Sequence, residues 1–187
     1  MFVGWSEIVV PALIATVLVF VASSVIHMVI RWHNADYRKL ANEDEVRAAL
    51  GRTSPAPGQY VLPHCTDQKA MASPEMQAKY EQGPNAILWV RPNGNVKLGP
   101  FLGAWTAYVF VVSMLVGYVG ASALPDVASY TKVFQVVGAA AWLAYAWGGP
   151  SDSIWKGRPW ISTVRGLVDG LVYACLTAGA FAWMWTR

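Results

Sequence analysis

The chain has 187 residues, of which 55% are hydrophobic and only 13% are charged. Soluble domains are about a quarter charged, so this composition favours a protein that lies mainly in a lipid bilayer. The formal net charge of +3 is small and scattered, which argues against nucleic acid as a partner. The two cysteines, Cys65 and Cys175, give no disulfide framework.

The first predicted element is a transmembrane helix over residues 8–30, within a first domain of residues 1–32. At about 1.5 Å per residue, this run is long enough to cross a hydrocarbon core of about 30 Å. Ser6 is expected to cap its N-terminus. The polar residues that interrupt the run are Thr16, Ser23, Ser24 and His27.

Residues 33–98 are predicted to form a small α/β insert in the cytoplasm. Two short helices are expected in it. The first follows Asn42 as N-cap and closes at Gly51. The second starts at Ser73, with proline at its first position, and stops at Gly83, which precedes another proline.

The end of the insert, residues 86–98, is predicted to form a β-hairpin. Apolar residues flank Asn93-Gly94, a pair typical of a two-residue hairpin turn. Because a lone hairpin is only marginally stable in water, we expect it to pack on Tyr60-Val-Leu or on the membrane face.

Three further transmembrane helices are predicted in the last domain, residues 99–187. Their approximate limits are residues 100–124, 127–147 and 162–185. The fold class is therefore an all-α membrane protein with four transmembrane helices. The small insert, with two short helices and a β-hairpin, lies between helices 1 and 2.

Small residues recur at every fourth position of the last helix. On a helix this spacing puts them on one face, where they allow another helix to approach closely within lipid. We expect this face to pack inside the bundle. A similar line, Gly99, Gly103 and Ala107, occurs in the second helix and favours neither internal nor external packing. The predicted packing residues of the last helix are Gly166, Gly170, Ala174, Ala178 and Ala182.

Basic residues are distributed unequally on the two sides of the predicted helices. They concentrate in the insert and in the connector between helices 3 and 4, whereas Lys132 and Arg187 lie on the opposite side. The positive-inside rule then predicts a multi-pass protein of the inner membrane, with both termini outside and residues 33–98 in the cytoplasm.

A polar cluster is predicted near the cytoplasmic ends of the first and last helices. Ser24, His27 and Arg31 share a face of the first helix, and Arg165 and Asp169 are four residues apart on the last one. An ionisable group at membrane depth is a functional candidate, although a structural role is the favoured interpretation. We expect Asp169 to accept a hydrogen bond from His27 or to pair with Arg31.

No catalytic residue, metal site or cofactor is predicted. The chain lacks nucleotide-binding, hydrolase and metalloprotease motifs. His64, Cys65 and Asp67 could ligate a metal, but adjacent residues rarely complete a tetrahedral site, and a surface loop is the preferred interpretation. Haem is disfavoured because only His27, of three histidines, lies within a predicted span.

Three segments, Gln59–His64, Ser73–Pro84 and Asp169–Ala174, resemble those of an uncharacterised family of bacterial four-span inner-membrane proteins. The resemblance covers most of the chain. It implies the four-span topology, and it brings no activity or site, because none is assigned to that family.

Two classes of function remain open from the sequence, with a weaker third. The first is a non-enzymatic accessory or assembly subunit of a membrane complex, which contacts a protein partner or itself in the bilayer. The second is a small oligomeric channel or carrier, with a polar path lined by His27, Arg31, Arg165 and Asp169. A redox membrane protein that binds haem is the third.

Overall fold

The computed structural model describes residues 4–186 and divides into two compact units. The first, here called the bundle, contains Met1–Arg38 and Lys97–Arg187; the second, here called the insert, is Lys39–Val96. The predicted insert was residues 33–98, so His33–Asp36 fold with the bundle and not with the insert.

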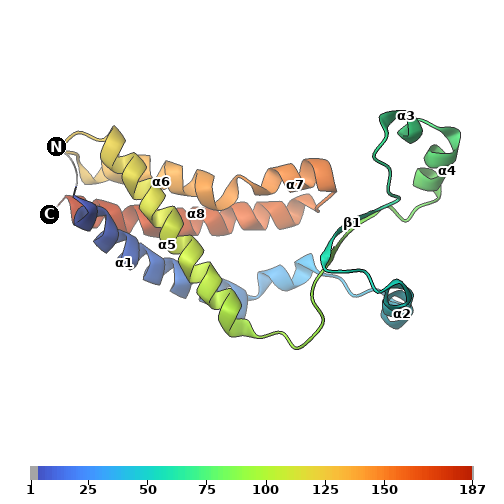
Figure 1. Cartoon of the computed structure of the whole chain (residues 1–187). Helices are drawn as coiled ribbons and strands as arrows, with labels where there is room; N and C mark the ends of the chain where they lie inside the picture. The colour runs from blue at the N-terminus through green and yellow to red at the C-terminus, as the bar shows by residue number, and fades with distance from the viewer. Residues whose placement is uncertain (1–3, 187) are drawn as a thin grey trace. The chain divides into compact units, whose positions relative to one another are not determined.

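The bundle is made of helices that run side by side (Figure 1). A π-helical segment, η1, continues α1, and a short 3₁₀ helix, η2, follows it. Hydrogen bonds place α6 and α7 along α8: Trp142 Nε1 donates to the Leu167 carbonyl at 3.1 Å, and the Ser153 and Thr163 hydroxyls are 2.6 Å apart. The bundle elements are α1 (Trp5–Ser24), η1 (Val25–Ile30), η2 (Trp32–Asp36), α5 (Leu98–Ala123), α6 (Tyr130–Ala146), α7 (Gly149–Lys156) and α8 (Trp160–Trp185).

Three of the described helices are long and apolar enough to cross a membrane. They are Trp5–Ile30, Leu98–Ala123 and Trp160–Trp185. These three helices support the prediction of a largely helical, membrane-embedded protein. The third predicted span corresponds to α6, which has 17 residues and is shorter than these three.

The centre of the bundle is α8, which packs against both α1 and α6. Of the five predicted packing residues, Gly170, Ala174, Ala178 and Ala182 are buried. A Cβ atom added at Gly170 would lie 2.5 Å from Ala146 Cβ of α6, so only glycine permits this approach. Gly166 differs, because a Cβ there would meet nothing within 4 Å.

A second close approach was not predicted. Gly117 of α5 faces the ring of Phe181, and a Cβ at this glycine would lie 2.6 Å from the ring. Phe181 is the largest of the fully buried side chains, and the missing glycine side chain makes the space for it. The line Gly99, Gly103 and Ala107 is exposed on α5 and takes no part in this packing.

The insert contains a two-stranded antiparallel sheet and three short helices. Strand β1 (Gly58–Leu62) pairs with β2 (Ala86–Val90), with Gly58 opposite Val90 and Leu62 opposite Ala86. Between the strands lie α3 (Gln68–Met71) and α4 (Pro74–Gln82), and α2 (Glu43–Thr53) precedes them. The predicted start of α4 is confirmed, since Ser73 Oγ accepts from the Met76 backbone N–H at 3.2 Å.

The predicted hairpin over residues 86–98 is wrong. Only β2 forms there, and its partner is β1, which contains the Tyr60–Leu62 segment on which the hairpin was expected to pack. Gly94 does have the positive φ of 127° that a turn uses, but α5 begins at Leu98 and leaves too few residues for a return strand. Pro92, which has no N–H, also cannot donate to a ladder.

Several predicted boundaries also shift. Gly4, and not Ser6, is the N-cap residue of α1. The helix expected to close at Gly51 continues to Thr53 and ends where Ser54 turns left-handed at φ 42°. α7 occupies part of the sequence expected to be an irregular connector before the last helix.

We expect Gly170→Leu to destabilise the bundle strongly and Gly166→Leu to do so much less. Both substitutions change helix propensity equally, but only the first inserts a side chain into the contact with Ala146. Overpacking of this kind costs about 1–3 kcal/mol. Thermal unfolding of the two purified variants would measure the difference, and equal melting temperatures would contradict the packing described.

Candidate functional site

The end of α1 departs from regular helix at the point where ionisable residues gather. Val25–Ile30 forms a π-helical segment, and Arg31 then adopts the left-handed conformation at φ 56° and ψ 23°. π-Helical segments change the residue spacing along a helix face and often occur at functional sites. Together these two features turn the chain so that η2 packs back against α8.

His33 of η2 lies between two carboxylates. Its Nδ1 is 2.7 Å from Asp36 Oδ2, and its Nε2 is 2.6 Å from Asp169 Oδ2 of α8. Only 8% of the Asp36 side chain and 7% of the Asp169 side chain are exposed. His33 therefore joins the end of the first transmembrane segment to the last one through buried polar contacts.

Asp36 is also held by the start of α8. Its Oδ1 accepts from Ser162 Oγ at 2.9 Å and pairs with the Arg165 guanidinium. Burial alone would raise the pKa of Asp36, but the hydrogen bonds from His33, Arg165 and Ser162 together lower it below its usual value. Asp36 is thus an ionised carboxylate that anchors one side of the His33 ring.

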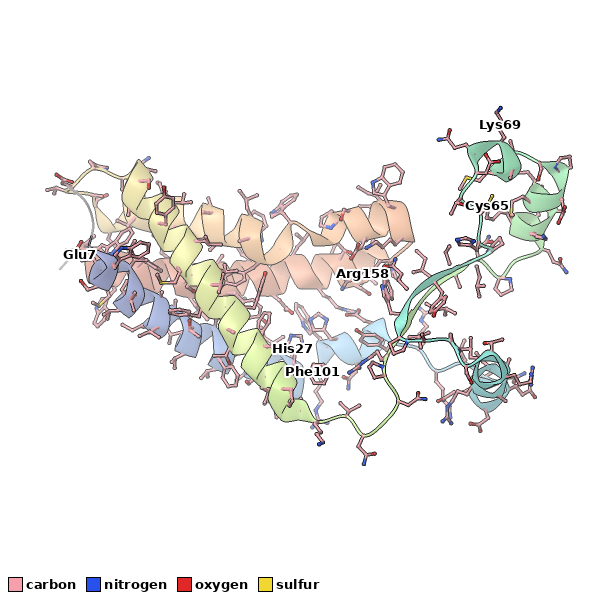
Figure 2. All side chains as sticks on the ribbon, viewed as in Figure 1. Glu7, His27, Cys65, Lys69, Phe101 and Arg158 are labelled. Carbon is pink, nitrogen blue, oxygen red and sulfur yellow. The ribbon has the colours of Figure 1, made fainter. Side chains whose placement is uncertain are left out.

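His27 is the third member of this group and lies at the more open side. Its Nε2 is 3.8 Å from Asp169 Oδ2, and half of its side chain is exposed. Figure 2 labels Glu7 near the start of α1 and His27 near the far end of the same first transmembrane segment. His27, His33 and Asp169 each offer one metal-ligating atom, and these atoms lie within 4.8 Å of one another.

The structure brings together part of the predicted cluster. His27 and Asp169 lie side by side, and Arg165 joins them through Asp36. Ser24 instead donates to the Phe20 carbonyl at 2.8 Å, and Arg31 donates to the Met28 carbonyl at 2.8 Å. The regular spacing that put Ser24 and Arg31 beside His27 fails because the π-helical segment alters it.

Sequence reasoning missed His33 and Asp36. Both follow the predicted first span and were assigned to the insert, so their proximity to Asp169 was not considered. The available signal was their position directly after a helix end that already carried His27, together with the need of Asp169 for a donor. The local fold-back at Arg31 could not be inferred from composition.

The other candidate ligand sets are not assembled. The ring centroids of His27 and His33 are only 4.8 Å apart, which is too close for the two rings to ligate opposite faces of a haem. In the insert, the Cys65 thiol donates to the backbone carbonyl of Asp67 at 3.4 Å. This contact is compatible with the prediction that His64 and Cys65 lie in a surface loop.

Comparison with known proteins gives no match: no family model, no curated protein and no solved structure matches the chain. The resemblance to the bacterial four-span family therefore stays a prediction.

We expect the stabilising effect of Asp36 to depend on pH. A carboxylate whose folded-state pKa is lowered contributes fully above the unfolded value of about 4, and the contribution is lost as pH falls through the folded pKa. The difference in melting temperature between wild type and Asp36→Asn should thus be largest near neutral pH and narrow towards pH 3.

The measurement is thermal unfolding between pH 7 and pH 3 in buffer that contains EDTA. Asp44→Asn is the matched control, because the Asp44 side chain is 97% exposed and carries the same charge. A gap between wild type and Asp36→Asn that stays constant over the whole range would show that Asp36 contributes nothing as an ionised partner.

Proposed function

We propose that this protein is a non-enzymatic accessory or assembly subunit of a larger bacterial inner-membrane complex. In this proposal it crosses the membrane four times, and its insert contacts a partner protein in the cytoplasm. Three features support the proposal: the insert exposes apolar side chains, the bundle brings particular helix ends together, and the ionisable groups of the polar cluster pair with one another.

The observation that carries the proposal is that the insert has no hydrophobic core. No residue of Lys39–Val96 is buried. Its sheet exposes apolar side chains, including Val61 at 42%, Leu62 at 45% and Trp89 at 61%. A two-stranded sheet alone is marginally stable in water, so a partner surface that covers these side chains would supply the missing hydrophobic burial.

The geometry of the bundle supports four crossings. Trp185 Nε1 near the end of α8 donates to the Glu7 carbonyl near the start of α1 at 2.7 Å, so these two ends lie together. Gly120, in the last turns of α5, lies at this same end, since a Cβ there would be 3.0 Å from the Trp185 ring. If α1, α5 and α8 all cross, then the chain between α5 and α8 must also cross, and α6 with α7 is that segment.

The sign of the flanking charges supports the orientation. Arg38, Lys97, Lys156 and Arg158 flank the bundle helices at the end where α1 finishes and α8 begins. Lys132 is near the other end, where α6 starts. The positive-inside rule favours the more basic end in the cytoplasm, with both termini outside.

The polar cluster favours an accessory subunit over a channel or carrier. Its ionisable groups pair with one another, and His33 and both carboxylates are largely buried. A transport path needs groups that face water along a continuous route. Arg31, which was expected to line such a path, is on the surface and hydrogen-bonded to its own helix.

We expect the protein extracted gently from native membranes to migrate in a complex much larger than one chain with its detergent. Trp89→Ala should release it from this complex, because the substitution removes the largest exposed apolar side chain of the sheet. Native gel electrophoresis followed by immunodetection would measure the size of the wild-type complex and the release of the Trp89→Ala variant from it. Tryptophan is enriched among the few interface residues whose truncation to alanine costs about 2 kcal/mol or more of binding free energy.

Trp155→Ala is the matched control for this experiment. Trp155 lies on α7 in the bundle and is 83% exposed, so its loss removes a similar side chain away from the insert. A wild-type protein that migrates as a single chain would contradict the proposal. So would a complex that Trp89→Ala and Trp155→Ala affect equally.

The topology has its own test. In a background with Cys65 and Cys175 replaced by serine, a membrane-impermeant thiol reagent should label Val127→Cys from outside and should not label Asp44→Cys until the membrane is opened. Val127 is 92% exposed in the turn before α6, and the Asp44 side chain is 97% exposed on α2. The reverse labelling pattern would invert the proposed orientation.

A further inference from the structure

We propose that His27, His33 and Asp169 form a binding site for a divalent first-row transition-metal ion such as Zn²⁺. The site lies at the end of the first transmembrane segment and joins it to α8. This goes beyond the proposed function and departs from the sequence analysis, which expected no metal ligands.

The positions of the three donor atoms suit one ion. Two donors on a tetrahedral Zn²⁺ are about 3.3 Å apart when the bonds are about 2.0–2.1 Å long. The His33 Nε2–Asp169 Oδ2 distance of 2.6 Å is shorter than that value and would have to widen, and the His27 Nε2–Asp169 Oδ2 distance of 3.8 Å is longer and would have to narrow, each by less than about 1 Å. His27 is half exposed, so its side chain can adjust to close the wider separation.

The surroundings of His33 are those of a metal-ligating histidine. Such a histidine donates its second ring N–H to a carboxylate, which fixes the tautomer and directs the other nitrogen to the metal. Asp36 Oδ2 occupies this position at 2.7 Å from His33 Nδ1. Asp36 is in turn held by Arg165 and Ser162, so the carboxylate is itself oriented.

This tautomer leaves two acceptors facing each other. With the proton on Nδ1, the lone pair of His33 Nε2 points at Asp169 Oδ2, 2.6 Å away. A positive charge must therefore bind both atoms. It is either a second proton on Nε2 that is donated to Oδ2, or a metal ion that both atoms ligate from a wider separation. The two cases differ at His27, whose Nε2 is 3.8 Å from the same oxygen: only a metal ion would bring this half-exposed side chain into the site as a third ligand.

Asp169 supplies a second, independent observation. Only 5% of Asp169 is exposed, and its other oxygen, Oδ1, is buried without a hydrogen-bond partner within residues 4–186. A buried carboxylate oxygen without a donor is costly. A metal ion bound by this carboxylate would neutralise the negative charge. Oδ1 as well as Oδ2 would then have a positive partner.

The donor set indicates the class of ion. Two imidazoles and one carboxylate suit zinc, iron and similar divalent ions, whereas magnesium and calcium prefer oxygen donors alone. Three protein ligands also leave at least one coordination position open. The site would therefore hold an ion that can still accept a water molecule or another ligand.

The test uses the full-length protein, purified in detergent and stripped of metal with EDTA. Zn²⁺ should raise the melting temperature of wild type, and Co²⁺ should give visible ligand-field absorption with a stoichiometry of one. His27→Ala should abolish both effects. The effect of Zn²⁺ on each protein is measured against the melting temperature of that same protein without metal, because His27 also contacts Asp169 and the His33 ring.

Two further variants sharpen the result. Asp36→Asn should weaken Zn²⁺ binding by roughly 10–100-fold, as expected for the loss of a carboxylate that orients a ligand. His64→Ala is the matched control, since it removes the histidine of the insert and should leave binding unchanged. Elemental analysis of the protein before stripping would identify the ion that it carries from the cell.

The proposal is overturned if Zn²⁺ leaves the wild-type melting temperature unchanged, which is the result expected when only a proton bridges His33 and Asp169. It is also overturned if His27→Ala binds Zn²⁺ as tightly as wild type. A loss of binding in His64→Ala equal to that in His27→Ala would likewise contradict it, because the insert would then supply the metal ligands.

Discussion

The need to satisfy one buried carboxylate shapes the end of this bundle. Asp169 lies on a helix of membrane length, where an ionised group without a partner is costly. Its partner, His33, reaches it only because η1 is π-helical and Arg31 turns left-handed. A left-handed residue other than glycine costs energy, and the contacts among His33, Asp36 and Arg165 offset that cost.

The rest of the bundle depends on how closely α8 can be approached. The small side chains of its packing face allow α6 to lie against it, and Gly170 does this most directly by contacting Ala146. Within lipid there is little hydrophobic force between helices, so such van der Waals contact is a main source of stability. This closest packing contact of α8 lies directly beside Asp169, which makes the polar link to His33.

The proposed metal site is close in sequence to the point where the chain passes from the bundle into the insert. The chain leaves the bundle directly after η2, and η2 carries His33 and Asp36. A metal ion bound by His33 would hold η2 on α8 and so fix the point from which the insert departs. The insert, which buries no side chain of its own, would in contrast take its stability from a partner.

The sequence by itself determined the features that depend on local composition. Apolar length predicted the three helices of membrane length, the four-residue spacing of small residues predicted the packing face of α8, and Ser73 predicted the start of α4. His27 and Asp169 were also predicted to be neighbours, since each lies a similar distance inside its helix end.

Only the tertiary structure decided which distant residues meet. The strand at Ala86–Val90 was expected to pair with the residues that follow it, but it pairs with Gly58–Leu62. Asp169 was expected to bond His27 or Arg31, but its closest side-chain contact is His33, at 2.6 Å. Both outcomes depend on chain reversals, one through α3 and α4 and one at Arg31. Arginine rarely adopts a positive φ, so nothing in the residue type at position 31 signals the reversal there.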